Sequence, residues 1–210
     1  LYFFDFKDSS EIKIKSNVYS APYWHSEGNL IYYSKKAKFP NKNGSRFYDI
    51  YSFNFDTEKE DRITIDARAF SPVFVRNDSS LYYLSTFDGG QDIYRLSLKD
   101  NTVSKITDFT HRPILSYLTY SEKENSLYFD ITSHHYRDIG SYNLSSKEVD
   151  FNFSQSSYDE RNISFGENEI SIHTIDKNGI FNLFFIDEKL NQSGYITNVT
   201  GGAFMPDISK

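Results

Sequence analysis

The chain has 210 residues, enough for one sizeable domain, and 18% of them are aromatic, which favours strands because rings pack well on a pleated sheet. Its net charge of −6 argues against nucleic acid as a partner, since phosphate binding relies on clustered Lys and Arg. Cysteine is absent, which excludes disulfides and thiolate metal sites. No apolar run approaches the roughly 18 residues that a membrane-spanning helix needs.

Short β-rich runs separated by turn residues recur along the whole chain. The copy at 66–110 predicts strands at about 71–75, 81–85, 92–98 and 103–107. In this copy we expect the turn Asp88-Gly89-Gly90 to supply the positive φ that a tight hairpin needs.

Laid along the chain, the same unit predicts a series of blades within a single domain. We expect the end of one blade at 1–17, complete blades at 18–65, 66–110, 111–155 and 156–200, and the start of a further blade at 201–210. We also expect that residue 1 is not a biological start and that closure of the ring needs sequence outside this segment.

Two landmarks fix the period of the repeat. The first is an Asx residue followed by an aliphatic residue, with Leu1 as a truncated first copy. The aliphatic positions 1, 50, 93, 139 and 183 lie 49, 43, 46 and 44 residues apart. The second is a strand that ends in Ile-Thr, at 63–64, 106–107 and 196–197. A period of roughly 40 to 50 residues with several short strands per unit is typical of β-propellers. The sequence therefore predicts an all-β propeller segment of four-stranded antiparallel blades, four of them complete and two partial.

The repeat resembles the TolB-like propeller repeat, a WD-like repeat of bacterial envelope proteins that also occurs in tricorn-type proteases. The resemblance rests on the strand starts at 20–24 and 71–74, the Asp-Ile-Tyr steps, the Ile-Thr strand ends and the segment 201–206. The third and fourth complete copies lack the Ser-Pro strand start, and the Pro-Asp-Gly turn of the family is replaced throughout. The resemblance implies an extracytoplasmic location, in the periplasm or cell envelope, and a protein or peptide partner.

Three acidic residues, Asp49, Asp92 and Asp138, occupy one position of the repeat. Because equivalent positions lie on different blades, we interpret them as structural side chains that cap the hairpin before strand three, and not as a catalytic set. The basic insertion at 35–48 could steer an anionic partner, although a solvated hairpin tip is the simpler interpretation.

Several His and Arg residues fall in the loops after strand two and in the crossovers between blades, which share one face of a propeller. A metal site needs a convergent third ligand that the sequence does not supply, so we expect no metal, no cofactor and no catalytic residue. We expect this face to be the binding surface, and its candidate residues are Arg46, Arg68, His111, Arg112, His134, His135 and Arg137.

These observations favour a non-catalytic module that binds proteins or peptides, or serves as a scaffold, within a larger bacterial envelope protein that contains the rest of the propeller and further domains. Two alternatives remain open. The segment could be the substrate-gating propeller of a prolyl-oligopeptidase-type or tricorn-type serine hydrolase whose catalytic domain lies outside it. It could also be a carbohydrate-active propeller with carboxylates around the pore.

Overall fold

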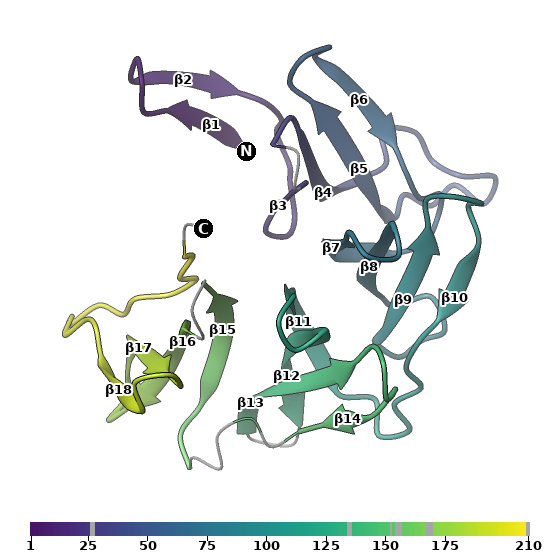
Figure 1. Ribbon diagram of the computed structural model, residues 1–210. Helices are drawn as coiled ribbons and strands as arrows, with labels where there is room; N and C mark the ends of the chain where they lie inside the picture. The colour runs from purple at the N-terminus through teal and green to yellow at the C-terminus, as the bar shows by residue number, and fades with distance from the viewer. Residues whose placement is uncertain (26–27, 134–135, 152, 154–156, 167–169, 209–210) are drawn as a thin grey trace. The chain divides into compact units, whose positions relative to one another are not determined.

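The computed structural model describes residues 1–25, 28–133, 136–151, 153, 157–166 and 170–208. Every regular element in this part of the chain is a β-strand, and the strands form antiparallel sheets, which confirms the predicted all-β propeller of blades (Figure 1). Within the described ranges no helix is suited to crossing a membrane. The chain divides into two compact units, Leu1–Thr110 and His111–Lys210.

The first unit contains a two-stranded sheet, β1–β2, and two four-stranded sheets, β3–β6 and β7–β10. In each sheet, strands that follow one another along the chain are hydrogen-bonded neighbours. The bounds are β1 Tyr2–Asp5, β2 Ser10–Lys13, β3 Tyr23–Trp24, β4 Leu30–Lys36, β5 Tyr48–Asn54, β6 Lys59–Arg62, β7 Ala69–Val75, β8 Ser80–Ser85, β9 Asp92–Ser97 and β10 Val103–Lys105.

The second unit contains two further four-stranded sheets of the same design, β11–β14 and β15–β18. Their bounds are β11 Ile114–Ser121, β12 Ser126–Ser133, β13 Tyr136–Asn143, β14 Val149–Asp150, β15 Glu160–Phe165, β16 Ile170–Lys177, β17 Ile180–Asp187 and β18 Gln192–Tyr195. The blade boundaries expected from the sequence, and their grouping into one domain, stay predictions.

In three copies the aliphatic residue of the repeated step lies in the core of its sheet, whereas Leu1 and Leu183 are half-buried. Ile50, Ile93 and Ile139 are all fully buried. The residue that follows Ile50 and Ile93 is a buried tyrosine, which pairs across the strands with a tyrosine of the preceding strand, Tyr33 with Tyr51 and Tyr83 with Tyr94. Burial of these rings and aliphatic groups, at about 25 cal/mol per Å² of apolar surface, is the main stabilising contribution within each sheet.

The third complete copy has glycine where the other copies have an aromatic ring. Gly140 pairs with Phe129 across β12 and β13, and Phe129 is fully buried. A Cβ atom on Gly140 would lie 2.6 Å from Cε2 of Phe129, so the phenyl ring occupies the place of the missing side chain. In this copy one ring therefore packs against glycine, where Tyr33 with Tyr51 and Tyr83 with Tyr94 place two rings side by side.

The Asx and Ile-Thr landmarks meet in a hydrogen-bonded pair that we name the Asx–Thr link. The Thr64 hydroxyl donates to the Asp49 carboxylate at 2.9 Å and accepts from the Ile50 backbone N–H at 2.9 Å. A backbone N–H of the following crossover, that of Ala67, also donates to Asp49 at 2.9 Å. The same link joins Asp92 to Thr107 and Asn182 to Thr197, each at 3.0 Å.

The link confirms a structural role for Asp49 and Asp92, but the partner differs from the expected one. These side chains fasten the end of strand four and the crossover after it, whereas we expected a cap on the hairpin before strand three. Asp138 is the exception. The residue fifteen positions later is Phe153 and not threonine, and among the described residues no hydrogen bond reaches the Asp138 carboxylate.

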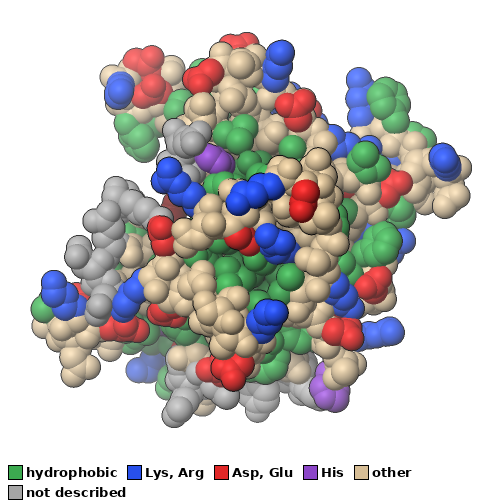
Figure 2. Space-filling view, turned by 45° about the vertical axis from the view of Figure 1, so that its right-hand side comes forward, with side chains coloured by type: hydrophobic (Ala, Val, Ile, Leu, Met, Phe, Trp, Pro, Cys, Tyr) green, Lys and Arg blue, Asp and Glu red, His purple; other side chains and the backbone are tan. Residues whose placement is uncertain are grey.

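Charged side chains of both signs are interspersed on the face that Figure 2 shows. In the basic insertion, Lys35 is paired with Glu60 at 2.6 Å and the Lys35 ammonium lies 4.5 Å from the Tyr51 ring centroid. Part of the positive charge that the sequence places at 35–48 is therefore neutralised inside the sheet that carries it.

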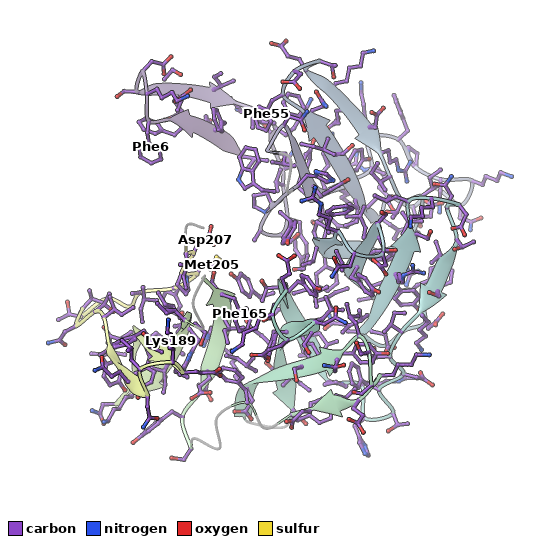
Figure 3. All side chains as sticks on the ribbon, viewed as in Figure 1. Phe6, Phe55, Phe165, Lys189, Met205 and Asp207 are labelled. Atoms are coloured by element: carbon purple, nitrogen blue, oxygen red, sulfur yellow. The ribbon has the colours of Figure 1, made fainter. Side chains whose placement is uncertain are left out.

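The segment after β18 returns to the first strand of its own sheet. The Ser164 hydroxyl donates to Asp207 at 3.2 Å, and Figure 3 shows Asp207 near Phe165 at the end of β15. The Ala203 N–H donates to the Phe181 carbonyl at 2.9 Å. These contacts order the described part of 201–210 beside β15 and β17.

Candidate functional site

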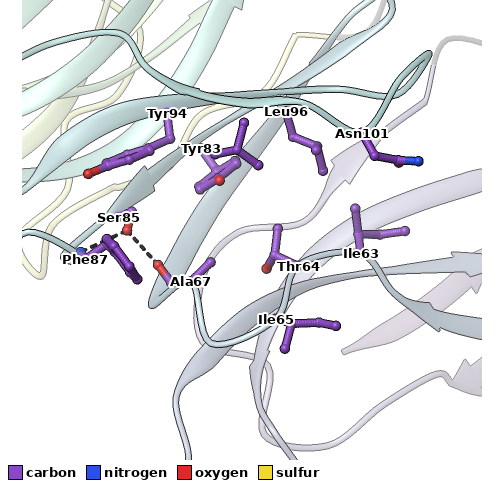
Figure 4. A pocket seen from close by; sticks show the side chains of 11 residues that line it. Ile63, Thr64, Ile65, Ala67, Tyr83, Ser85, Phe87, Tyr94, Leu96 and Asn101 are labelled. Atoms are coloured by element: carbon purple, nitrogen blue, oxygen red, sulfur yellow. Dashed lines mark hydrogen bonds between the residues drawn. The ribbon is translucent and has the colours of Figure 1, made fainter.

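A pocket of about 450 Å³ lies in the first unit, between the crossover that follows β6 and the sheet β7–β10 (Figure 4). Eleven residues line it: Ile63, Thr64, Ile65, Ala67, Tyr83, Ser85, Phe87, Tyr94, Leu96, Asn101 and Val103. Its volume lies in the range of roughly 300 to 1,000 Å³ that is typical of pockets for small ligands.

Two tyrosines of neighbouring strands contribute ring surface to the pocket. The rings of Tyr83 and Tyr94 are stacked, with centroids 6.0 Å apart. The Tyr94 hydroxyl donates to Asp88 at 2.7 Å, whereas no described residue is hydrogen-bonded to the Tyr83 hydroxyl. Burial raises the pKa of Tyr83 to about 12, and burial together with the bond to Asp88 raises that of Tyr94, so both are neutral near pH 7.

Two other hydroxyls of the lining are already used by the fold. The Thr64 hydroxyl belongs to the Asx–Thr link with Asp49. The Ser85 hydroxyl donates to the Ala67 carbonyl at 2.6 Å and accepts from the Phe87 N–H at 3.0 Å, as the dashed lines in Figure 4 show. These bonds hold the crossover and the loop after β8 against the sheet. The Tyr83 hydroxyl is therefore left as the free donor and acceptor among these tyrosine, serine and threonine groups.

Apolar side chains reach solvent around the pocket. Ile65, Phe87 and Val103 are 75%, 61% and 58% exposed, although they are large and apolar. They come from three separate segments: the crossover, the loop after β8 and strand β10. Apolar side chains that gather around a hollow mark a surface on which a partner can bury area.

The charged groups beside this site are paired with each other. The Lys105 ammonium lies 2.6 Å from Asp108, 3.1 Å from Asp92 and 3.5 Å from Asp88. The hydrogen bond to Asp108 is the largest cause of the raised pKa of Lys105, and the hydrogen bond from Tyr94 is the largest cause of the lowered pKa of Asp88. Across the described ranges, no set of three or more His, Asp or Glu residues is placed to hold a metal ion.

The binding face expected from the sequence stays a prediction, and its described members do not line this pocket. Arg68 is exposed and directly follows Ala67 of the lining. Its guanidinium lies 4.4 Å from the centroid of the Phe47 ring, and Phe47 follows the exposed Arg46 in the sequence. The others that are described, His111, Arg112 and Arg137, are exposed residues of the second unit. His134 and His135 lie outside the described residues.

The sequence carried one signal for the pocket that its interpretation missed. Phe87 stands in a turn whose other members, 86–90, are Thr, Asp and two Gly, and an aromatic residue in such a turn has no reason to be there from turn chemistry alone. Ile65, which directly follows the first Ile-Thr strand end, is a similar signal, since it is an apolar residue in a crossover, between Thr64 and Asp66.

Solved structures of other propellers superpose on this chain. TolB from Acinetobacter baumannii matches with a TM-score of 0.74 and 17% identity, over 98% of this chain and 50% of its own. The chain has a TolB-like propeller fold. A putative TolB from Agrobacterium tumefaciens matches with a TM-score of 0.67 and 15% identity, over 84% of this chain and 64% of its own. The β-propeller domain of the Trilobed protease from Pyrococcus furiosus matches with a TM-score of 0.63 and 11% identity, over 99% and 80%.

This TolB-like chain thus spans about half the length of the Acinetobacter baumannii protein. Structures of a peptidase and of an oligogalacturonate lyase match it as well, so the likeness describes the fold and leaves the activity open. No protein-family model matches the sequence, and no curated protein does.

Proposed function

We propose that this chain is a non-catalytic binding module and that it holds an apolar side chain of a protein or peptide partner in the pocket of the first unit. One observation supports this best. The lining combines apolar surface with hydroxyl and amide groups, and its only titratable members, Tyr83 and Tyr94, have raised pKa values and stay neutral. Such a lining suits binding better than proton transfer near pH 7.

The exposed side chains support a polypeptide as the occupant. Ile65, Phe87 and Val103 surround the hollow, so a partner residue inserted there would contact them from several sides. Each 100 Å² of apolar surface that this contact removes from water contributes about 2.5 kcal/mol before the costs of association. The Tyr83 hydroxyl can add one hydrogen bond, to a backbone carbonyl of the partner.

The resemblance to the TolB-like repeat extends the proposal to the whole protein. We infer an extracytoplasmic location in a bacterium, with the module acting as a scaffold inside a longer envelope protein. The exposed Arg68 beside the pocket, together with Arg46, would extend the binding surface towards acidic residues of the partner.

A second candidate is a gating propeller of a serine hydrolase, and the match to the propeller of the Trilobed protease favours it. The full-length sequence separates the two candidates. A Gly-x-Ser-x-Gly motif after a predicted strand in a neighbouring domain would favour the hydrolase.

The proposal is tested by photo-crosslinking from the full-length protein, with a photoreactive phenylalanine analogue in place of Phe87. The crosslinked partner is identified, and its recovery is then measured with Phe87→Ser and Val103→Ser. We expect at least tenfold less partner with either substitution. Phe39→Ser is the matched control, because Phe39 is also exposed in the first unit but does not line the pocket. Equal recovery with all three variants would contradict the proposal.

A further inference from the structure

A group of acidic residues lies in the second unit where β13 and β15 begin. Asp138 is the third residue of β13, Asp159 directly precedes β15, and Glu160 is its first residue. Burial, and then the negative charges of Glu160 and Asp159, raise the pKa of Asp138, which places the three carboxylates within electrostatic reach of one another. The Arg137 N–H donates to Asp159 at 3.4 Å.

Asp138 is free for another role because its repeat position has lost the usual partner. Asp49, Asp92 and Asn182 each use this position to hold a threonine hydroxyl in the Asx–Thr link. Phe153 stands where that threonine would be, and a phenyl ring donates no hydrogen bond to a carboxylate.

Glu160 and His173 supply an independent observation beside these carboxylates. Glu160 is 2% exposed and His173 is 1% exposed. Among the described residues neither ring nitrogen of His173 has a hydrogen-bond partner, and its Nε2 lies 3.8 Å from Oε1 of Glu160. Burial lowers the pKa of His173 to about 4, so the ring is neutral at pH 7 and supplies no positive charge beside Glu160.

The basic residues nearby do not fill this gap among the described residues. The guanidinium of Arg161 lies 4.0 Å from the Phe181 ring centroid, and Arg161 and Glu160, as neighbours on a strand, point to opposite faces of the sheet. The side chain of Arg137 is exposed, and in the described part of the chain no Lys or Arg lies within 4.0 Å of the carboxylates of Asp138, Asp159 or Glu160. A buried carboxylate without a positive partner is costly, so the arrangement suits a cation from outside.

We propose that Asp138, Glu160 and His173 form a site for a primary ammonium group, from a lysine side chain or a chain N-terminus of a partner polypeptide. An ammonium nitrogen has three N–H donors and could lie about 2.8 to 3.0 Å from both the Glu160 oxygen and the His173 nitrogen, which are 3.8 Å apart. Asp138 would add its negative charge, which lies within electrostatic reach of Glu160, and its partly exposed side chain gives access from solvent.

The surroundings favour an ammonium group over a metal ion. The rings of Phe153 and Phe184 lie 5.8 and 5.6 Å from the His173 ring, and phenyl faces attract organic cations. In the described ranges these residues do not form a set of three His, Asp or Glu ligands placed for a metal. This proposal concerns a second group of the polypeptide partner, its ammonium group. It does not depend on the apolar pocket of the first unit.

The test is an NMR titration of the full chain, with the ring signals of His173 as the reporter. The probes are glycinamide, which has a free ammonium group, acetyl-lysinamide, which has one on a side chain, and acetylglycinamide, which has none. We expect glycinamide or acetyl-lysinamide to shift the His173 signals with saturation, and acetylglycinamide to leave them unchanged. Tighter binding of glycinamide would indicate a chain N-terminus, and tighter binding of acetyl-lysinamide a lysine side chain. Binding should weaken about tenfold in Glu160→Gln and in Asp138→Asn and stay unchanged in Glu148→Gln, an exposed acid of the same unit.

Several results would overturn the site. These are the absence of any saturating shift, an equal response to acetylglycinamide, equal affinity in all variants, or a response to calcium or manganese chloride at the same signals. If Glu160→Gln does not fold, Asp138→Asn decides, because its side chain is less buried. Failure here leaves the pocket variants of the first unit unaffected, so the two proposals fail separately.

Discussion

The hydroxyl of Thr64 donates to the carboxylate of Asp49 at 2.9 Å and ties the segment just after β6 to the start of β5. Asp49 is fully buried and also accepts from the backbone N–H of Ala67 and from the guanidinium of Arg62, at 2.9 and 2.5 Å. One side chain thus joins two strands and the crossover to the next sheet. This explains why Asx and Ile-Thr recur together in the sequence, about fifteen residues apart within a unit.

Substitution of Asp49 by alanine should destabilise the first unit strongly. It removes the acceptor of four donors and leaves the Thr64 hydroxyl buried without its partner, for which we expect a loss of about 3 to 5 kcal/mol in the free energy of unfolding. Urea unfolding measures this. Asp138→Ala is the matched control, since Asp138 has the same repeat position without the link, and it should cost less than about 1 kcal/mol. Equal losses at both positions would contradict the role of the link.

Gly140→Ala should destabilise the second unit by overpacking. The new Cβ would meet Phe129 at 2.6 and 2.9 Å, and the ring is fully buried on the neighbouring strand, so it cannot move away freely. We expect a loss of about 1 to 3 kcal/mol in chemical unfolding. Gly201→Ala tests the method, because a Cβ there meets nothing within 4 Å, and its effect should be close to zero. A neutral Gly140→Ala would mean that the Phe129 ring can repack.

The repeat made the sheets predictable, because its landmarks are the residues that hold each sheet together. Ile50, Ile93 and Ile139 are buried as their period suggests, and the Ile-Thr ends mark the Asx–Thr link. Gly140 stood out in the sequence as a variant, but its reason lies in Phe129 on the neighbouring strand, eleven residues away along the chain, and only the strand register brings them together.

The pocket could not be predicted in the same way. Ile65 and Phe87 belong to a crossover and a turn, where the repeat imposes no period, and the space between them depends on how far two sheets diverge. The sequence drew attention to charged loop residues instead, because His and Arg are conspicuous in polar loops. Apolar residues in loops form no repeating pattern. They do expose apolar surface to water, and turn chemistry does not require them, so their presence indicates a binding surface.

The two tyrosines of the pocket should respond differently to loss of the hydroxyl. Tyr94→Phe removes the hydrogen bond to Asp88 and should lower the free energy of unfolding by about 1 kcal/mol. Tyr83→Phe removes a hydroxyl without a described partner and should be neutral or slightly stabilising, within about 0.5 kcal/mol. Thermal and urea unfolding of both variants provide the comparison. A larger loss with Tyr83→Phe than with Tyr94→Phe would show that the Tyr83 hydroxyl has a partner in solution.

Two buried groups of the second unit, Asp130 and His173, should contribute to the pH dependence of its stability in opposite directions. Burial raises the pKa of Asp130 to about 7, so between about pH 4 and pH 7 the folded chain holds a proton that the unfolded chain has released, and stability falls as the pH rises. Burial lowers the pKa of His173 to about 4, so between pH 4 and 6.5 the unfolded chain holds the extra proton and stability rises with pH. The two effects oppose each other between pH 4 and 6.5.

Asp130→Asn separates the two effects, because the asparagine oxygen can still accept the 2.7 Å hydrogen bond from the Asn162 N–H while the side chain no longer titrates. The variant keeps the contribution of His173, so the difference in stability between variant and native chain isolates Asp130. Each pH unit corresponds to about 1.4 kcal/mol for one proton. From pH 5 to pH 7 the variant should therefore gain about 2 to 3 kcal/mol in free energy of unfolding relative to the native chain. Urea unfolding at several pH values measures it, and parallel pH profiles for the two proteins would mean that Asp130 is ionised in the folded chain throughout this range.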